Sequence, residues 1–301
     1  MNNVWTLDRA LTAAEQSGFA LGSFSPRLTP MIQAVLAAGE KTASPLSVQI
    51  SSRELVRYGV TPQEFADEFY AQVAAQQISV PVVLHLDHSW DFDVIAAAIE
   101  AGFTSVMIDA SEHPLDENIR RTKEIVEFAH ARGVSVEAEL GRIGTTDFIE
   151  TDSDEELYTV PAEAQQFVEA TGVDALAVSV GTAHGVYVVR QPKVDFERLS
   201  AIRALSSVHL VLHGGSGVPA EMIAQAIRIP GGGVSKVNIA TDLEIAMLEA
   251  LGRSEHLTNA ECKALTPEQL AVARQAVEAT VVDKITNFLG SAGKAPELLG
   301  T

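Results

Sequence analysis

The chain contains 301 residues, of which 47% are hydrophobic and 20% are charged, so it can bury a large core and is not a disordered tail. Forty acidic residues against 21 basic ones give a net charge of −19, which excludes sequence-independent attraction to nucleic acid or anionic membranes. The single cysteine, Cys262, cannot form an internal disulfide, and no stretch approaches the roughly 18 apolar residues of a membrane span. We therefore expect a cytoplasmic protein that binds neither nucleic acid nor membrane.

Short runs rich in Val, Ile and Leu alternate along the chain with amphipathic stretches long enough for helices. This alternation is typical of a parallel sheet whose strands are connected by helices. We predict strands at residues 20–24, 46–50, 82–86, 105–108, 135–140, 175–180, 210–212 and 234–239. Each is followed by a plausible helix, such as residues 61–77, which start at a Thr-Pro pair, and residues 115–132, which end before Gly133.

Eight strand–helix units in this length predict an α/β fold, a (β/α)₈ TIM barrel, because a doubly wound open sheet usually has fewer strands and a glycine fingerprint after the first one. No linker rich in Pro, Gly or Ser is visible, so we expect residues 1–301 to form a single domain. Residues 267–288 predict an extra C-terminal helix that packs on the barrel or on a second subunit. Its apolar stripe comprises Leu270, Val272, Val277, Val281, Ile285 and Phe288.

Polar and glycine residues gather where six successive predicted strands end, which is where a barrel carries its chemistry. These segments are His85-Leu86-Asp87-His88, Asp109-Ala110-Ser111, Glu137 with Glu139, Gly181-Thr182-Ala183-His184-Gly185, His213-Gly214-Gly215-Ser216-Gly217 and Asn238-Ile239-Ala240-Thr241-Asp242. The two glutamates share one face of their strand, because alternate residues point the same way. Charges inside a core strand are costly, which favours a functional role for them.

Three histidines follow the third, sixth and seventh predicted strands: His88, His184 and His213. A single histidine near a strand end is more often a structural residue than a ligand. A closed barrel, however, brings these three strand ends together, and three protein ligands with one open position are typical of catalytic zinc. We therefore predict a Zn²⁺ site here, and we interpret His85, nearer the middle of its strand, as a core residue or as a support for a ligand.

Glycine-rich or small residues follow the last two predicted strands, at residues 214–217 and 238–241. Such a turn can serve only as a tight connection. At this place in a barrel, however, free backbone amides and the next helix N-terminus usually bind phosphate. A phosphate beside a metal suits enolate chemistry or hydrolysis of an anionic substrate.

The segments HLDH, SVMIDAS, VEAELG, GTAHG, LHGGSG and KVNIATD, in this order and spacing, resemble the class II metal-dependent ketose-bisphosphate aldolases. The tagatose-bisphosphate aldolase branch looks nearest. The resemblance implies a zinc-dependent aldolase that reversibly cleaves a phosphorylated ketose or keto-sugar into dihydroxyacetone phosphate and an aldehyde, through a metal-stabilised enediolate. The partner is then a phosphorylated sugar, and we expect a homodimer or homotetramer.

The resemblance also assigns roles to residues. His88, His184 and His213 match the zinc ligands, and Asp87 matches the acid/base that exchanges a proton with the C4 oxygen of the substrate. Asp109 and Glu139 match positions that hold an alternative zinc position or a second cation, divalent or monovalent. The candidate substrate-binding residues are Gly185, Gly214, Gly215, Ser216, Asn238, Ile239, Ala240 and Thr241, which match the donor contacts, together with Ser51 after the second predicted strand.

The chain departs from the family pattern in three places. Asp147 stands where the family has a glutamate that moves the donor's carbon-bound proton, and Glu150 is the second candidate for this role; alternatively, this stretch is only an acidic solvated loop. The segment Thr266-Pro267-Glu268 replaces Asp-Pro-Arg, whose arginine binds the distal phosphate in some members. An unusual pair, Arg53 and Arg57, follows the second predicted strand.

Because of these departures, three kinds of substrate remain as alternatives. They are fructose or tagatose bisphosphate, a deoxy-keto-gluconate phosphate, and a related sugar whose aldehyde fragment lacks a phosphate. Two other classes of protein compete with an aldolase. A metal-dependent hydrolase on the same barrel also needs an open zinc, but it would lack the phosphate cradle. A non-catalytic subunit would have lost a ligand or Asp87, and none of these residues is missing.

Overall fold

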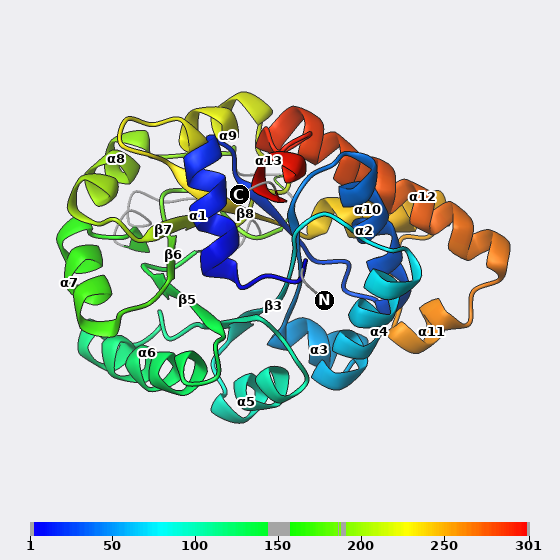
Figure 1. The fold of residues 1–301 in the computed structure, drawn as a ribbon, viewed down its shortest axis with the longest axis horizontal. Coiled ribbons are helices and arrows are strands. Elements are labelled where there is room, and N and C mark those ends of the chain that lie inside the picture. The colour runs from blue at the N-terminus through cyan, green and yellow to red at the C-terminus, as the bar shows by residue number, and fades with distance from the viewer. Residues whose placement is uncertain (1–2, 144–156, 186, 188–190, 300–301) are drawn as a thin grey trace.

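The computed structural model describes residues 3–143, 157–185, 187 and 191–299. Eight parallel strands form a closed barrel in chain order, with helices around it (Figure 1). The strands are β1 (Leu21–Phe24), β2 (Leu46–Ser51), β3 (Val82–Ser89), β4 (Ser105–Ile108), β5 (Ser135–Leu140), β6 (Ala175–Val178), β7 (His209–Leu212) and β8 (Val234–Ile239). The predicted TIM barrel is thereby confirmed.

Helices follow or connect all of these strands. They are α1 (Leu7–Ser17), the 3₁₀ turn η1 (Thr29–Met31), α2 (Ile32–Lys41), α3 (Ser52–Tyr58), α4 (Pro62–Ala75), α5 (Phe92–Glu100), α6 (Leu115–His130), α7 (Pro161–Thr171), α8 (Phe196–Leu205), α9 (Ala220–Ile227), α10 (Thr241–Ala250), α11 (Asn259–Lys263), α12 (Pro267–Lys284), the π-helical turn η3 (Ile285–Leu289) and α13 (Ala295–Leu299). None of the helices in the described part of the chain combines the length and the apolar character needed to cross a membrane.

The two faces of the barrel sheet belong to separate apolar cores, as the alternation of side chains along a strand requires. On β3, Val82 and Leu84 belong to the core under the surrounding helices, whereas Val83 belongs to a cluster inside the barrel. Helix α1 lies across one end of the barrel (Figure 1), and its Leu11 joins the inner cluster with Val211 of β7. This apolar plug fills the end at which the strands begin and leaves the interior near their carboxyl ends for polar residues.

The predicted C-terminal helix exists and packs against α2 and α10, so it lies on the barrel (Figure 1). It starts as α12 with a capping box between Thr266 and Gln269 and continues without interruption into η3. The stripe prediction was wrong for Val272, whose side chain is 47% exposed. Buried Val277 and Val281 are four residues apart, and the same spacing backward along the helix reaches buried Ala273 instead.

Two predicted strand ends were also wrong by more than one residue. Strand β3 extends to Ser89 instead of ending at Leu86, because Asp87 still pairs with Ser51 of β2 and Ser89 pairs with Ile108 of β4. Strand β6 ends two residues earlier than predicted. The longer β3 places Asp87 and His88 inside a strand, which holds them more rigidly than a loop would.

Candidate active site at the carboxyl ends of the strands

Three imidazoles converge where β3, β6 and β7 end. The ring centroid of His88 lies 4.9 Å from that of His184 and 4.5 Å from that of His213, and the last two are 5.7 Å apart. One nitrogen from each ring lies within 4.8 Å of the others, as a shared metal ion requires. The structure therefore brings together all three histidines that the sequence singled out.

Strand β3 supplies two neighbouring residues to the same site, which strict alternation along a strand forbids. Asp87 faces the barrel interior like Val83. The pairing register between β3 and β4 shifts between Leu86 and Ser89, and His88 has a φ of 22°, a backbone angle that side chains rarely adopt. This irregularity turns the His88 imidazole back toward the interior, beside Asp87.

The donor atoms of the site fit a cation. The atoms His88 Nε2, His213 Nδ1 and Glu139 Oε2 are buried and have no hydrogen-bond partner in the described ranges. The other ring nitrogens are occupied: His88 Nδ1 lies 2.9 Å from Asp109 Oδ2, and His213 Nε2 lies 2.8 Å from Glu137 Oε1. A carboxylate on one ring nitrogen leaves the other with a lone pair for a metal, so these histidines are prepared as ligands.

The electrostatics of the site also favour a positive charge. Burial lowers the pKa of His88, but the carboxylates of Asp87, Asp109 and Glu139 outweigh it and raise that pKa to about 10. Burial, assisted by the charge of His88, lowers the pKa of His184 to about 4. Burial also raises the pKa of Glu139, to about 8. The surroundings of His88 thus favour a positive charge, and a divalent cation can take the place of the proton on this imidazole.

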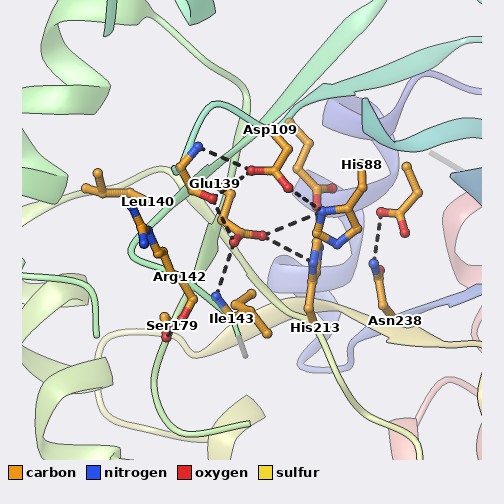
Figure 2. A network of polar contacts seen from close by, with 12 residues as sticks. His88, Asp109, Glu139, Leu140, Arg142, Ile143, Ser179, His213 and Asn238 are labelled. Atoms are coloured by element: carbon orange, nitrogen blue, oxygen red, sulfur yellow. Dashed lines mark hydrogen bonds and ion pairs between the residues drawn. The ribbon is translucent and has the colours of Figure 1, made fainter. Parts of the chain in front are cut away.

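Asp109 and Glu139 flank the histidines in different ways (Figure 2). Both oxygens of Asp109 are used: Oδ2 faces His88, and Oδ1 accepts hydrogen bonds of 2.7 Å and 3.2 Å from the hydroxyl and amide of Ser111. Glu139 Oε2 lies 3.8 Å from His88 Nδ1 and 3.7 Å from His213 Nδ1. Asp109 is thus suited to orient His88, whereas Oε2 of Glu139 has no hydrogen-bond partner among the described residues and is available to a cation. That Asp109 and Glu139 hold a second cation stays a prediction.

A buried chain of polar groups connects a metal-ligand candidate to Asp87, and the sequence did not reveal it. Lys236 Nζ lies 2.9 Å from Glu137 Oε2 and donates a 2.7 Å hydrogen bond to Asn238 Oδ1. Asn238 Nδ2 in turn donates a 3.0 Å hydrogen bond to Asp87 Oδ1, while Gln49 donates one of 3.1 Å to Asp87 Oδ2. The available signals were a lysine inside the apolar strand Val234–Ile239 and Glu137 inside the strand Ser135–Leu140.

The segment after β7 packs closely against the segment after β6 and against the first turn of α10. A side chain at Gly214, which has a φ of 65°, would place its Cβ 2.3 Å from the carbonyl oxygen of Ala183, so only glycine fits. Ser216 Oγ accepts a 3.3 Å hydrogen bond from the amide of Asp242 in the first turn of α10. The N-cap of α10 is Ala240, which has no side chain that can cap a helix. This helix N-terminus, whose N-cap residue has no capping side chain, lies beside a glycine turn and fits the predicted phosphate cradle.

The remaining predicted site residues have varied settings. Ser51 caps α3, because its hydroxyl accepts a hydrogen bond from the Glu54 amide. Gly185 directly follows His184. Ile239 has a buried apolar side chain, and its carbonyl accepts a hydrogen bond from the Ser25 amide. Thr241 begins α10 next to the cradle. The loop candidates Asp147 and Glu150 lie outside the described residues.

The protein is similar to aldolases over its whole length. The family model "Fructose-bisphosphate aldolase class-II" matches residues 5–294. The chain is 39% identical over 293 residues to a fructose-bisphosphate aldolase of Geobacillus stearothermophilus, which covers 97% of this chain and 99% of that protein. It is 36% identical over 310 residues to the fructose-bisphosphate aldolase of Helicobacter pylori, with coverages of 94% and 97%.

Solved structures show the same likeness. The crystal structure of the YdjI aldolase from Escherichia coli K12 matches with a TM-score of 0.80 at 32% identity, over 97% of this chain and 99% of that one. The structure of a putative fructose-1,6-biphosphate aldolase from Coccidioides immitis matches with a TM-score of 0.79 at 30% identity, over 96% and 97%. Fold and sequence similarity thus agree.

Metal binding can be tested by replacing His88, His184 or His213 singly with alanine. Each change removes one of three nitrogen ligands, so we expect zinc affinity to fall by at least about 100-fold, more than the loss typical of supporting residues. Metal content after dialysis against a zinc buffer measures this effect. The control is His113→Ala, an exposed histidine after β4, which should bind zinc like the parent. Parental affinity in two of the three variants would contradict the assignment.

The buried ion pair between Lys236 and Glu137 can be tested through the stability of the protein. Lys236→Met leaves Glu137 as an uncompensated buried charge, so we expect the free energy of unfolding to fall by about 3–5 kcal/mol. The double variant Lys236→Met/Glu137→Gln removes both charges and should recover most of that loss. Urea denaturation measures both values. A single variant as stable as the parent would show that these two side chains do not form a buried ion pair.

Proposed function

The chain belongs to the class II fructose-bisphosphate aldolase family, and from this premise we propose that it is a zinc enzyme that reversibly cleaves a phosphorylated ketose into dihydroxyacetone phosphate and an aldehyde. As a member of this family it is a metal-dependent lyase. The observation that carries the proposal is the convergence of His88, His184 and His213 beside Asp87, at the rim that also carries the glycine cradle.

The donor set supports zinc as the metal. Three imidazole nitrogens suit zinc, whereas magnesium and calcium prefer oxygen ligands. His88, His184 and His213 would hold the ion. When bound, the ion supplies Lewis-acid polarisation of the donor's carbonyl group. Asp109 and Glu137 keep two of the imidazoles in the orientation and tautomer that binding needs.

Asp87 is placed to move the proton at the oxygen of the scissile carbon–carbon bond. Its two oxygens accept amide hydrogen bonds from Asn238 and Gln49, which fix the carboxylate in one orientation. In cleavage, Asp87 removes the proton of the substrate hydroxyl, the adjacent carbon–carbon bond breaks, and the aldehyde leaves. The electron pair of that bond stays with the three-carbon donor, which then takes a proton from a second acid. Condensation runs through the same transfers in reverse.

The second acid is assigned to the loop after β5, where Asp147 and Glu150 are the candidates. The donor's phosphate is assigned to the segment 214–217 together with the N-terminus of α10, where Ala240 and Thr241 stand. Gly185 and Asn238 are assigned to contacts with the donor between its phosphate and its reacting carbon. The support for this arrangement is the tight turn at Gly214 and the neighbouring N-terminus of α10, whose N-cap residue Ala240 has no capping side chain.

The substrate and the assembly complete the proposal. Both curated relatives described above are fructose-bisphosphate aldolases, which makes fructose bisphosphate the first substrate to assay, with tagatose bisphosphate next. Glu268 near the C-terminus favours the alternative of an acceptor without a phosphate or derived from a sugar acid, because its charge repels a phosphate. We also propose a single-domain, cytoplasmic homodimer or homotetramer; its one cysteine, Cys262, is free and buried.

Asp87→Asn tests the proton transfer without disturbing the metal ligands. The amide cannot accept the substrate's proton, so we expect the cleavage rate to fall by about 10²–10⁴-fold. Zinc content should stay at the parental value. Turnover of fructose bisphosphate measures the first quantity and metal analysis the second. If the variant retained most of the parental kcat, another group would have to perform this transfer.

Exchange of the donor's carbon-bound proton tests the loop. In deuterated solvent with dihydroxyacetone phosphate and no aldehyde, only the second acid acts, so Asp147→Ala should slow the exchange by about 10²-fold or more. Glu150→Ala serves as the matched comparison within the loop. If both variants exchange at the parental rate, the loop is an acidic solvated segment and the base lies elsewhere.

A further inference from the structure

The first turn of α3 stands directly beside the metal-ligand strand. Ser52 Oγ donates a 2.7 Å hydrogen bond to the carbonyl oxygen of His88, which fastens this helix to β3. At the strand ends, Ser51 pairs in register with Asp87. Arg53 follows these residues, so its side chain starts at the rim of the barrel, close to the candidate acid/base.

Arg53 is held over an aromatic ring. Its guanidinium carbon lies 5.0 Å from the ring centroid of Trp90, which follows His88 by two residues. Trp90 is 48% exposed, an unusual setting for a large apolar side chain. A guanidinium stacked on a ring still presents N–H groups along its edge, and this edge can bind an oxyanion with two parallel hydrogen bonds.

Arg53 has no acidic partner within ion-pair distance in the parts of the chain that the structure describes, unlike its neighbour. Arg27 forms ion pairs with Glu54 and Glu244. Glu54 also accepts a 2.9 Å hydrogen bond from Ser25 Oγ, and Glu244 accepts one of 2.8 Å from Tyr58. These two carboxylates are therefore already paired, which leaves the guanidinium of Arg53 without an ion pair among the described residues.

The donor's phosphate is assigned to the segments after β7 and β8. The rest of a substrate then extends from Asp87 toward the side of the rim formed by β2 and β3, where Arg53 and Trp90 lie.

Building on the proposed aldolase function, we propose that Arg53, supported by Trp90, binds the anionic end of the aldehyde fragment. The group recognised is an oxyanion at the far end of the aldehyde, either a carboxylate or a phosphate. Both present two oxygens at a spacing that matches the two N–H groups on a guanidinium edge. Arg53 is thus a specificity-determining residue on the acceptor side, in a chain that has Glu268 where some family members have an arginine.

Condensation with dihydroxyacetone phosphate tests this proposal with three aldehydes on the full-length zinc-loaded enzyme. They are glyceraldehyde 3-phosphate, succinic semialdehyde and uncharged glyceraldehyde. In Arg53→Gln we expect KM for the anionic aldehyde that the enzyme prefers to rise by about tenfold or more, a loss of about 1.4 kcal/mol. KM for glyceraldehyde should change by less than about twofold, since it offers no oxyanion. The aldehyde that shows the loss identifies the group as phosphate or carboxylate.

Three further variants sharpen the test. Arg57→Gln is the matched control, because Arg57 is an exposed arginine on the same helix whose guanidinium carbon lies 5.7 Å from the Tyr58 ring centroid; it should behave like the parent. Arg53→Lys keeps the charge without the two-pronged edge and should recover only part of the affinity. Trp90→Leu should raise KM for the same aldehyde, by less than Arg53→Gln does.

The proposal is overturned if Arg53→Gln changes KM for all three aldehydes equally, or for none of them. It is also overturned if Arg57→Gln produces the same selective loss. Donor proton exchange without aldehyde separates this failure from a failure of the proposed function. A parent enzyme that exchanges the proton, combined with an unselective Arg53→Gln variant, leaves the aldolase function standing and refutes only the role of Arg53; a parent that exchanges no proton refutes the function itself.

Discussion

The fully buried ion pair between Lys236 and Glu137 is the constraint on which the rest of the site depends. Two charges in the barrel interior are costly unless every remaining donor and acceptor is satisfied. Glu137 accepts a hydrogen bond from the Nε2–H group of His213, which leaves Nδ1 for a cation, and Lys236 fixes the oxygen of the Asn238 amide, which aims its nitrogen at Asp87. One ion pair thereby favours one tautomer of a candidate metal ligand and fixes the orientation of the candidate acid/base.

This ion pair requires that water be excluded from the barrel interior at the end where the strands begin. Helix α1 seals the end where the strands begin, with Leu11 and its neighbours packed on interior residues such as Val83 and Val211. The imidazoles lie at the opposite end, near the carboxyl ends of the strands. Burial lowers the pKa of His88, but low polarity also strengthens its interactions with the surrounding carboxylates, which raise that pKa to about 10.

The fold and the three histidines were predictable because both follow from local patterns. Short continuous apolar runs between amphipathic stretches identify the strands, and closure of eight strands forces residues at their ends to meet. The partner of Lys236 was not predictable, because the pairing of two charges on β5 and β8 depends on register and on side-chain geometry across the barrel. Nor was the irregularity at His88, since strict alternation would have placed Asp87 and His88 on opposite faces. Val272 was wrongly assigned to the buried face of α12, because the sequence shows that it is apolar but does not show which side of the helix faces the barrel.

The two halves of the candidate site differ in the burial of their side chains, and this difference affects how easily substrate specificity can change. The half proposed to hold the metal and the donor consists of buried side chains and a glycine turn at Gly214, where substitutions leave an unpaired charge or a clash. The half proposed to bind the acceptor consists of exposed side chains after β2 and β3, such as Arg53 and Trp90, where substitutions usually change stability by less than about 0.5 kcal/mol. A barrel organised in this way can change the aldehyde it accepts without rebuilding its metal centre. Strong overall similarity to fructose-bisphosphate aldolases therefore constrains the donor chemistry far more tightly than it constrains the acceptor.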